Sequence, residues 1–240
     1  MEYKLGKLPA KKDPRTLLVS TILKKVKVPV SYSFDTKHTG IPTPMFGNDE
    51  HGDCVIAGRA HQTLRFEREE QKKTIKISDD DVLKEWYKEN GGTENGLTVL
   101  DSLNSWRKEG WMVGGKNYKI KAFAANDPHD MEEIKTTIYL DIGIGLGLSL
   151  PDGWRDELNA GKPWANTYHP PNPYNGHYVY VVGYNSHNLT CLTWGQKQKM
   201  SWAFFKKYTD EAYAIIDDKN IKKLDEEKIN DFLKDHPLNP

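Results

Sequence analysis

Apolar and polar residues follow a helical period in the first half of the chain. From position 54 to about 73 the apolar and small residues recur every three to four positions, and charged residues fill the end of the stretch. A second helical pattern at 82–89 follows an acidic start at Ser78, a residue typical of a helix N-terminus. A third pattern covers 98–108. We therefore expect three helices here.

The second half has the spacing of β-strands. Residues 142–150 alternate small and large side chains, which is typical of a buried strand that neighbouring groups approach closely. The stretch 152–174 is rich in Pro, Gly, Asn and Trp and predicts a loop. The remaining patterns are a short helix at 131–139 and strands at 117–124, 177–184, 188–193 and 212–216. Helices followed by strands predict an α+β chain of two lobes with a cleft between them.

The ends of the chain differ from this body. Residues 1–27 are rich in Lys and Pro, with one apolar patch from Leu17 to Leu23, and predict an arm or short leader helix. Their place ahead of the body raises the hypothesis of an inhibitory leader lying across the cleft. The body, 28–217, divides into a helical lobe at about 48–115 and a β lobe at about 116–217. Residues 218–240 predict a charged C-terminal helix or tail.

Composition narrows the classes of function. Of 240 residues, 37 % are hydrophobic, and 34 basic residues balance 34 acidic ones, which argues against a dedicated nucleic-acid binder. No apolar run is long enough for a membrane span. With two cysteines and no apolar leader in this sequence, we expect a cytoplasmic protein. We also expect no nucleic-acid or membrane partner and no cofactor.

Cys54 is the candidate nucleophile. It follows Gly52 and Asp53 and begins the first helical pattern, so the partial positive charge of a helix N-terminus lies beside its sulphur. His177 begins a strand of the second half and could supply an imidazolium across the cleft. The alternative is a structural role for each: a buried thiol and an ordinary strand residue. Cys191 lies in a strand between apolar neighbours and is expected in the core.

Two other kinds of site fit the sequence less well. His51, Cys54 and His61 have spacing that suits metal ligands, but a structural zinc site takes four such ligands and no further pair follows. We therefore predict no metal. The glycine run at 143–147 lacks the lysine of a phosphate-binding loop, so close packing of a strand explains it better. The aromatics around the predicted loop either form a wall of the cleft or anchor the loop: Trp154, Trp164, Tyr168 and Tyr174.

Six segments in order give the chain a resemblance to the papain-like cysteine peptidases from about 28 to 216. Asn48-Asp-Glu-His-Gly-Asp-Cys54 is similar to the family's glutamine-to-cysteine segment, and Gly176-His177 followed by Tyr-Val-Tyr-Val-Val-Gly-Tyr184 is similar to its histidine strand. The other four are the proline start at 28–35, Asn95-Gly96, Leu192-Thr193-Trp194-Gly195 and the closing strand at 211–216. The resemblance implies a helical N-terminal lobe and an antiparallel sheet or barrel in the C-terminal lobe.

The resemblance also implies roles for single residues. Cys54 would attack a carbonyl carbon as a thiolate, and His177 would act as general acid and base. Asn48, with the Cys54 backbone N–H, would hold the oxyanion. Asn95, Gly96 and Trp194 would line the groove for a peptide or protein substrate, and Trp194 would also shield His177 from water.

The chain departs from the family pattern at several places. Leu192 falls where the family has an Asn that orients the histidine, so Thr193 or Gln196 would have to replace it. The family's second nearby cysteine is missing, and Val55 follows the nucleophile where the family has Trp. Two functions are therefore open. One is a thiol hydrolase that cleaves or transfers peptide or amide bonds through an acyl-thioester. The other is a catalytically weak or inactive fold that serves as a binding or structural module.

Overall fold

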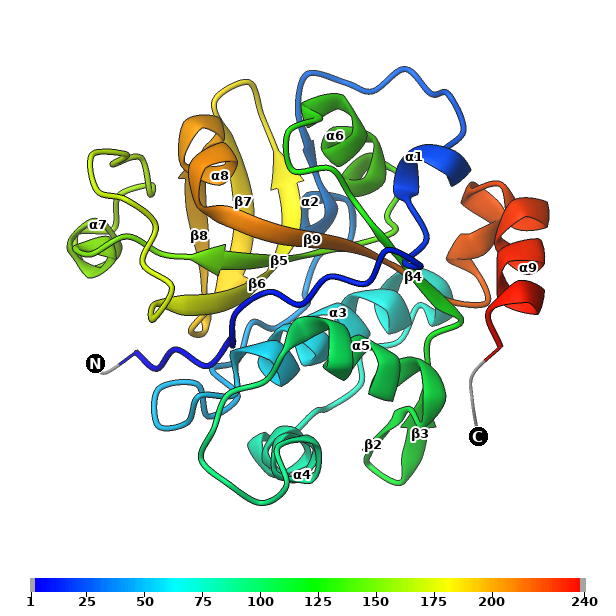
Figure 1. The fold of residues 1–240 in the computed structure, drawn as a ribbon, viewed down its shortest axis with the longest axis horizontal. Helices are drawn as coiled ribbons and strands as arrows, with labels where there is room; N and C mark the ends of the chain where they lie inside the picture. Colours follow the sequence, from blue (N-terminus) through cyan, green and yellow to red (C-terminus); the bar gives the residue numbers. More distant parts are fainter. Residues whose placement is uncertain (1–2, 238–240) are drawn as a thin grey trace.

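The computed structural model describes residues 3–237 and places a helical lobe against an antiparallel sheet (Figure 1). The seven-stranded sheet has the order β4-β9-β5-β6-β7-β8, and β1 pairs with β6. A separate hairpin, β2-β3, belongs to the helical lobe. In Figure 1 the helices α3, α4 and α5 and this hairpin lie below the sheet, and α6 and α8 lie above it.

The elements of the described chain have the following bounds. The helices are α1 Val19–Ile22, α2 Phe34–Lys37, α3 Cys54–Gln71, α4 Asp79–Glu89, α5 Val99–Lys108, α6 Met131–Tyr139, α7 Trp154–Asn159, α8 Trp202–Tyr208, the 3-10 helix η1 Asn220–Lys223 and α9 Glu226–Asp235. The strands are β1 Tyr32–Ser33, β2 Trp111–Val113, β3 Lys116–Tyr118, β4 Ala122–Ala125, β5 Ile144–Ser149, β6 Gly176–Tyr184, β7 Asn188–Thr193, β8 Gln196–Ser201 and β9 Thr209–Ile216.

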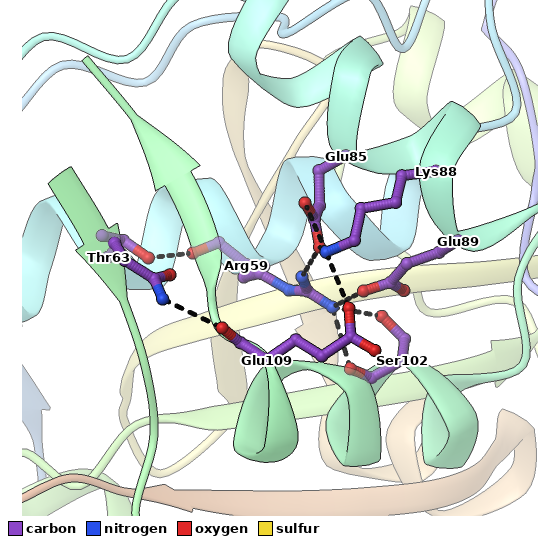
Figure 2. Close-up of polar contacts among 8 residues, drawn as sticks. Arg59, Thr63, Glu85, Lys88, Glu89, Ser102 and Glu109 are labelled. Atoms are coloured by element: carbon purple, nitrogen blue, oxygen red, sulfur yellow. Dashed lines mark hydrogen bonds and ion pairs between the residues drawn. The ribbon is translucent and has the colours of Figure 1, made fainter. Parts of the chain in front are cut away.

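Helix α3 is the centre of the helical lobe. It is buried from its first residue to position 67 and ends at Lys72, whose φ of 55° is left-handed. Its Arg59 is buried and ties three helices together, because its guanidinium contacts Glu85 and Glu89 of α4 and the carbonyl of Ser102 in α5 (Figure 2). The position of α3 in this lobe is therefore fixed by a buried ionic network as well as by apolar packing.

Strand β6 lies between two cores because its side chains alternate in direction. Tyr178 packs in the core under α3, and Val179 and Val181 pack in the core on the opposite face. The neighbouring β5 leaves room for the tyrosine, since a Cβ at Gly145 would lie 1.6 Å from the Tyr178 hydroxyl oxygen. The small-large alternation of this strand thus serves close packing.

A two-residue turn joins β7 to β8. Both of its residues have positive φ, 44° at Trp194 and 70° at Gly195, as a type I′ hairpin turn requires. The turn matches the twist of the flanking strands and places the Trp194 ring on the face of the sheet that carries His177.

The α+β class and the order of helices before strands are confirmed, but several boundaries are wrong. The segment 152–174 holds helix α7, and Trp154 and Trp164 are buried, whereas Tyr168 and Tyr174 are exposed. The stretch 117–124 contains parts of two strands in different sheets, β3 and β4. The C-terminal segment, for which a helix or tail was expected, forms η1 and α9. Strand β8 and helix α8 were not expected at all.

Within residues 3–237 no helix combines the length and the apolar character needed to cross a membrane.

Candidate active site

Cys54 is the first residue of α3 and lies where the two lobes meet. It is 1 % exposed. Its sulphur receives hydrogen bonds from the backbone of Tyr178 and of Gly6. Tyr178 directly follows His177 in β6, so the thiol of the helical lobe contacts the histidine strand of the sheet. The two candidates are thus neighbours in space although they are far apart in sequence.

The His177 ring is held on one edge and one face. Its Nε2 lies 2.6 Å from the Thr193 hydroxyl, and its face stacks on Trp194 with ring centres 3.9 Å apart and planes 8° from parallel. Its Nδ1 is buried and has no hydrogen-bond partner among the described residues. The contacts therefore fix the ring and leave one nitrogen open to exchange a proton.

Burial keeps both groups neutral in this structure. It raises the pKa of the Cys54 thiol to about 12, although the hydrogen bonds from Tyr178 and Gly6 lower it. Burial likewise lowers the pKa of His177 to about 3. A helix N-terminus should favour a thiolate, so the sequence suggested a reactive cysteine. With the groove occupied as in this structure, burial instead favours the neutral thiol.

The candidate oxyanion donor, Asn48, is buried just before α3. Its side-chain amide donates to the carbonyl of His51 at 3.0 Å and to the carbonyl of Lys4 at 3.5 Å. Beside it, burial raises the pKa of Asp53 to about 8, although the Asn48 side chain lowers it. The Asn48 amide is thus oriented, and one of its acceptors comes from the N-terminal segment.

Residues 3–8, here called the arm, occupy the groove between the lobes. The arm passes Cys54 as an extended chain, and its backbone pairs with both walls (Figure 1). The Leu97 N–H donates to the Gly6 carbonyl at 2.8 Å, and the Lys7 N–H donates to the Gly176 carbonyl at 3.1 Å. The arm therefore covers the thiol and makes the peptide-like contacts that the groove offers.

Two candidate groove residues lie where the arm passes. A Cβ at Gly96 would lie 1.9 Å from the Gly6 carbonyl oxygen, so the glycine is needed for this close approach. The Trp194 indole N–H donates to the Lys4 carbonyl at 3.0 Å, and its ring packs against Tyr3. Asn95 is exposed, and its carbonyl accepts from the Asn90 side chain instead.

The two candidate orienting residues face each other across the β7-β8 hairpin. The hydrogen bond to the His177 ring comes from Thr193, while Gln196 is half-buried at the start of β8. Leu192 is buried in a small core with Phe34. A side chain at 192 thus points away from the site, and the next position supplies a hydroxyl.

The structure does not gather the metal candidates of the sequence. His51 contacts Glu94 through Nδ1 at 3.4 Å, and the buried His61 ring packs on Phe46. Within residues 3–237 the three potential ligands that converge are instead His38, Glu69 and Asp141. Lys37 and the Tyr32 hydroxyl already bind the Asp141 carboxylate, so we interpret this group as part of an ion-pair network.

Cys191 is a free, buried cysteine in the core opposite α3, as expected from its apolar neighbours. Three charged residues that no sequence motif singles out, Lys7, Asp210 and Glu211, meet at one end of the groove. No local pattern could have shown this meeting, because the lysine and the acids lie at opposite ends of the chain.

Comparison with solved structures identifies the architecture. No protein-family model matches the sequence, and no curated protein matches it. The chain is similar to xylellain, a cysteine protease from Xylella fastidiosa, with a TM-score of 0.68 and 16 % identity over 90 % of this chain and 97 % of that one. It is also similar to the Carica candamarcensis cysteine protease CMS1MS2 in complex with E-64, with a TM-score of 0.59 and 13 % identity over 80 % of this chain and 100 % of that one.

A third similar structure is the ragweed pollen allergen Amb a 11, a cysteine protease solved in its proform. Its TM-score is 0.60, with 13 % identity over 82 % of this chain and 69 % of that one. The fold of this chain is therefore papain-like, as its six segments suggested.

Proposed function

We propose that this chain is a papain-like thiol hydrolase that cleaves or transfers a peptide or amide bond through an acyl-thioester on Cys54. The observation that carries the proposal is the contact between the Cys54 sulphur and the backbone next to His177, whose ring is fixed by Thr193 and Trp194. A nucleophile with a base in reach and a third group that orients the base is the arrangement of a thiol hydrolase. The similar solved structures are named as cysteine proteases, which supports the same class.

The reaction starts from neutral partners. The Cys54 thiol gives its proton to Nδ1 of His177, and the thiolate attacks the carbonyl carbon of the substrate. The oxyanion accepts hydrogen bonds from the Cys54 N–H and the Asn48 amide. His177 then returns the proton to the leaving amine as the C–N bond breaks. Water, activated by the same imidazole, cleaves the thioester and restores the thiol.

Thr193 is a positioning residue in this scheme. When His177 takes up a proton at Nδ1, its Nε2 must carry one too, and the Thr193 hydroxyl at 2.6 Å accepts a hydrogen bond from it. Trp194 covers the ring face and keeps water from it. Together the two side chains do the work that the family assigns to an Asn at the position of Leu192.

The second candidate function, a binding or structural module, has its own observation. In this structure the pKa of Cys54 is raised to about 12 and that of His177 is lowered to about 3, so neither group is charged at neutral pH. A module that binds peptides in the groove without cleaving them needs no charged pair. The two functions differ in what happens to Cys54 once the groove is open.

A labelling and turnover experiment on the full chain separates them. Iodoacetamide labelling of Cys54 is followed against pH, and hydrolysis of a mixed fluorogenic peptide-amide library is measured for the native chain and for the Cys54→Ala and His177→Ala variants. The hydrolase predicts turnover that either substitution abolishes. The matched control is Cys191→Ala, which removes the other buried thiol and should leave turnover unchanged.

The native chain could give a low rate because the arm covers the thiol, so Gly6→Ala is measured beside it. A Cβ at this glycine would lie 1.7 Å from the Gly52 carbonyl oxygen, which displaces the arm. If Gly6→Ala has no turnover and its Cys54 labels no faster than a free thiol, the hydrolase proposal is refuted and the module is supported.

A further inference from the structure

The arm inserts one side chain deep into the body. Lys7 is buried, with its side chain 1 % exposed, and its ammonium lies 3.0 Å from Oδ2 of Asp210 and 3.4 Å from Oε1 of Glu211. It also donates to the Leu8 carbonyl at 3.1 Å. Lysine is rarely buried unless it is paired, so this contact marks a position built for a cation.

The pocket around the ammonium is preformed by the sheet. Asp210 and Glu211 begin β9, and the Ser149 hydroxyl at the end of β5 donates to Oδ2 of Asp210 at 2.7 Å. A Cβ at Gly147 would lie 2.3 Å from Cε of Lys7, so the glycine opens the space for the lysine stem. The pocket therefore combines a channel for an aliphatic stem with two acids at its end.

The pocket offers more carboxyl oxygens than the Lys7 ammonium contacts, and burial raises the pKa of Glu211 to about 7 although Lys7 lowers it. The Glu211 side chain is 5 % exposed and lies beside Tyr213, and Oδ1 of Asp210 has no hydrogen-bond partner among the described residues. The carboxyl groups of Asp210 and Glu211 both face the single ammonium of Lys7. Their other oxygens could accept hydrogen bonds from a side chain that has more N–H donors than lysine. An arginine guanidinium, with five N–H donors in a planar fork, matches two carboxylates as well as a lysine does.

The backbone next to the pocket is ready for any extended peptide. The Leu97 N–H and the Gly176 carbonyl, which pair with the arm, are main-chain groups and do not select a sequence. Selection must come from the side chain that enters the pocket. The arm itself is poorly placed for cleavage, because Gly6 gives the Cys54 sulphur a backbone hydrogen bond. The backbone N–H of Gly6 therefore faces the Cys54 sulphur, whereas cleavage requires the sulphur to face the carbonyl carbon of the bond that is cleaved.

We propose that the pocket of Asp210, Glu211 and Ser149 selects peptides with a lysine or arginine side chain, and that Lys7 is the chain's own occupant of this pocket. The arm must leave before such a peptide enters. The selection of a cleaved substrate rests on the proposed hydrolase function, while the binding of the peptide does not. The occupant and the substrate compete for the same two carboxylates.

Binding is tested first, without any hydrolysis. The receptor is the full chain with Cys54→Ala, which removes the nucleophile, and Lys7→Glu, which sets a negative charge against the pocket and expels the arm. A fluorescent peptide with the sequence of residues 3–10 is compared with the same peptide carrying norleucine, the uncharged analogue of lysine, at position 7. Fluorescence polarisation gives the dissociation constants.

We expect the lysine peptide to bind about tenfold or more tightly than the norleucine peptide, since a hydrogen bond to a charged group contributes that much. The difference should shrink when the receptor also carries Glu211→Gln. Equal affinity of the two peptides overturns the pocket proposal. The comparison of two peptides on one receptor stays valid even if the glutamine variant folds poorly.

Labelling and turnover then separate this proposal from the hydrolase itself. Lys7→Glu should speed iodoacetamide labelling of Cys54, whereas the matched change Lys11→Glu should not, because the Lys11 ion pair with Asp101 is exposed. Equal labelling of the two variants overturns the role of Lys7 as occupant. Cleavage without preference for basic peptides refutes the pocket alone. Lysine-dependent binding without any cleavage supports the pocket and refutes the hydrolase.

Discussion

The buried network around Arg59 gives the most direct test of what holds α3, and with it Cys54, in place. We consider Arg59→Met, which keeps the length of the side chain and removes its charge. The guanidinium is 3.2 Å from Glu85, 2.7 Å from Glu89 and 2.9 Å from the Ser102 carbonyl, and the two carboxylates are themselves about 5 % exposed (Figure 2). The variant leaves the buried Glu89 carboxylate without its cation, and Glu85 keeps only the half-exposed Lys88 at 3.3 Å.

The size of the effect follows from that burial. Removing one partner of a buried ion pair costs about 3–5 kcal/mol, because the remaining charge has lost its partner and has no water. For a chain of this length each kcal/mol corresponds to a shift of roughly 2–4 °C in Tm. We therefore expect Arg59→Met to unfold roughly 6–20 °C below the native chain at pH 7.5.

The loss of stability in Arg59→Met should depend on pH. Burial already raises the pKa of Glu85 with Arg59 present, and without the guanidinium, which lowers it, this carboxyl should hold its proton still more strongly in the folded state than in the unfolded one. A folded state that binds more protons gains stability as pH falls. The deficit of Arg59→Met should therefore be smaller at pH 5 than at pH 7.5.

Calorimetry or urea unfolding at both pH values measures the deficit. The control is Lys84→Met, which breaks an ion pair with Asp80 in which both side chains are 74 % exposed and water screens the charges, so it should leave stability almost unchanged. If Arg59→Met matches this control at pH 7.5, or if its deficit does not shrink at pH 5, the reasoning about the buried network is wrong.

Three further predictions concern the site and its frame. Thr193→Val removes the hydroxyl that lies at Nε2 of His177 and should lower kcat/KM about 10- to 100-fold. Thr193→Ser, which keeps a hydroxyl, should retain most of the native kcat/KM. If Thr193→Val leaves both the rate and the pH-rate profile unchanged, the positioning role is contradicted. Burial raises the pKa of Asp53 to about 8, so the folded chain keeps a proton that the unfolded chain loses above about pH 4. The free energy of unfolding should therefore fall by roughly 1.4 kcal/mol per pH unit between about pH 4 and pH 8. Asp53→Asn should remove that slope in urea unfolding, and parallel slopes would refute the assignment. Gly58→Ala places a Cβ 2.5 Å from the Tyr178 ring and should lower the free energy of unfolding by about 1–3 kcal/mol. If the free energy of unfolding does not change measurably, α3 and β6 can move apart easily and the close contact is not needed.

Regular periodicity explains what the sequence could predict. The pattern after Cys54 is long and the run from His177 to Tyr184 is strongly apolar, so both elements were placed close to their true bounds. Strand β8 was missed because its exposed lysines and its amides hide the alternation, which becomes visible only once β7 is beside it. Helix α7 was missed because helix-breaking residues surround its six residues.

The candidate site was predictable where it depends on side-chain types in order. Cys54, His177 and Asn48 were proposed from neighbouring residues that carry the resemblance, and Thr193 from its place next to Leu192, and their roles stay predictions. The state of the site was not predictable, because the high pKa of the thiol comes from its burial in the folded chain, which no local pattern around Cys54 shows. The arm reaches the groove through backbone hydrogen bonds, which leave no pattern of side chains to recognise.

The covalent link between the arm and the body has a consequence for how strongly the groove is closed. A ligand on a tether meets its site at an effective concentration on the order of millimolar, whatever the concentration of the protein. Dilution of the intact chain therefore cannot empty the groove, and a competing peptide must overcome that local concentration in addition to the contacts of Lys7. A single cut in the chain between the arm and Leu17, which pairs with Ala125 of β4, would turn the arm into a free peptide that diffuses away.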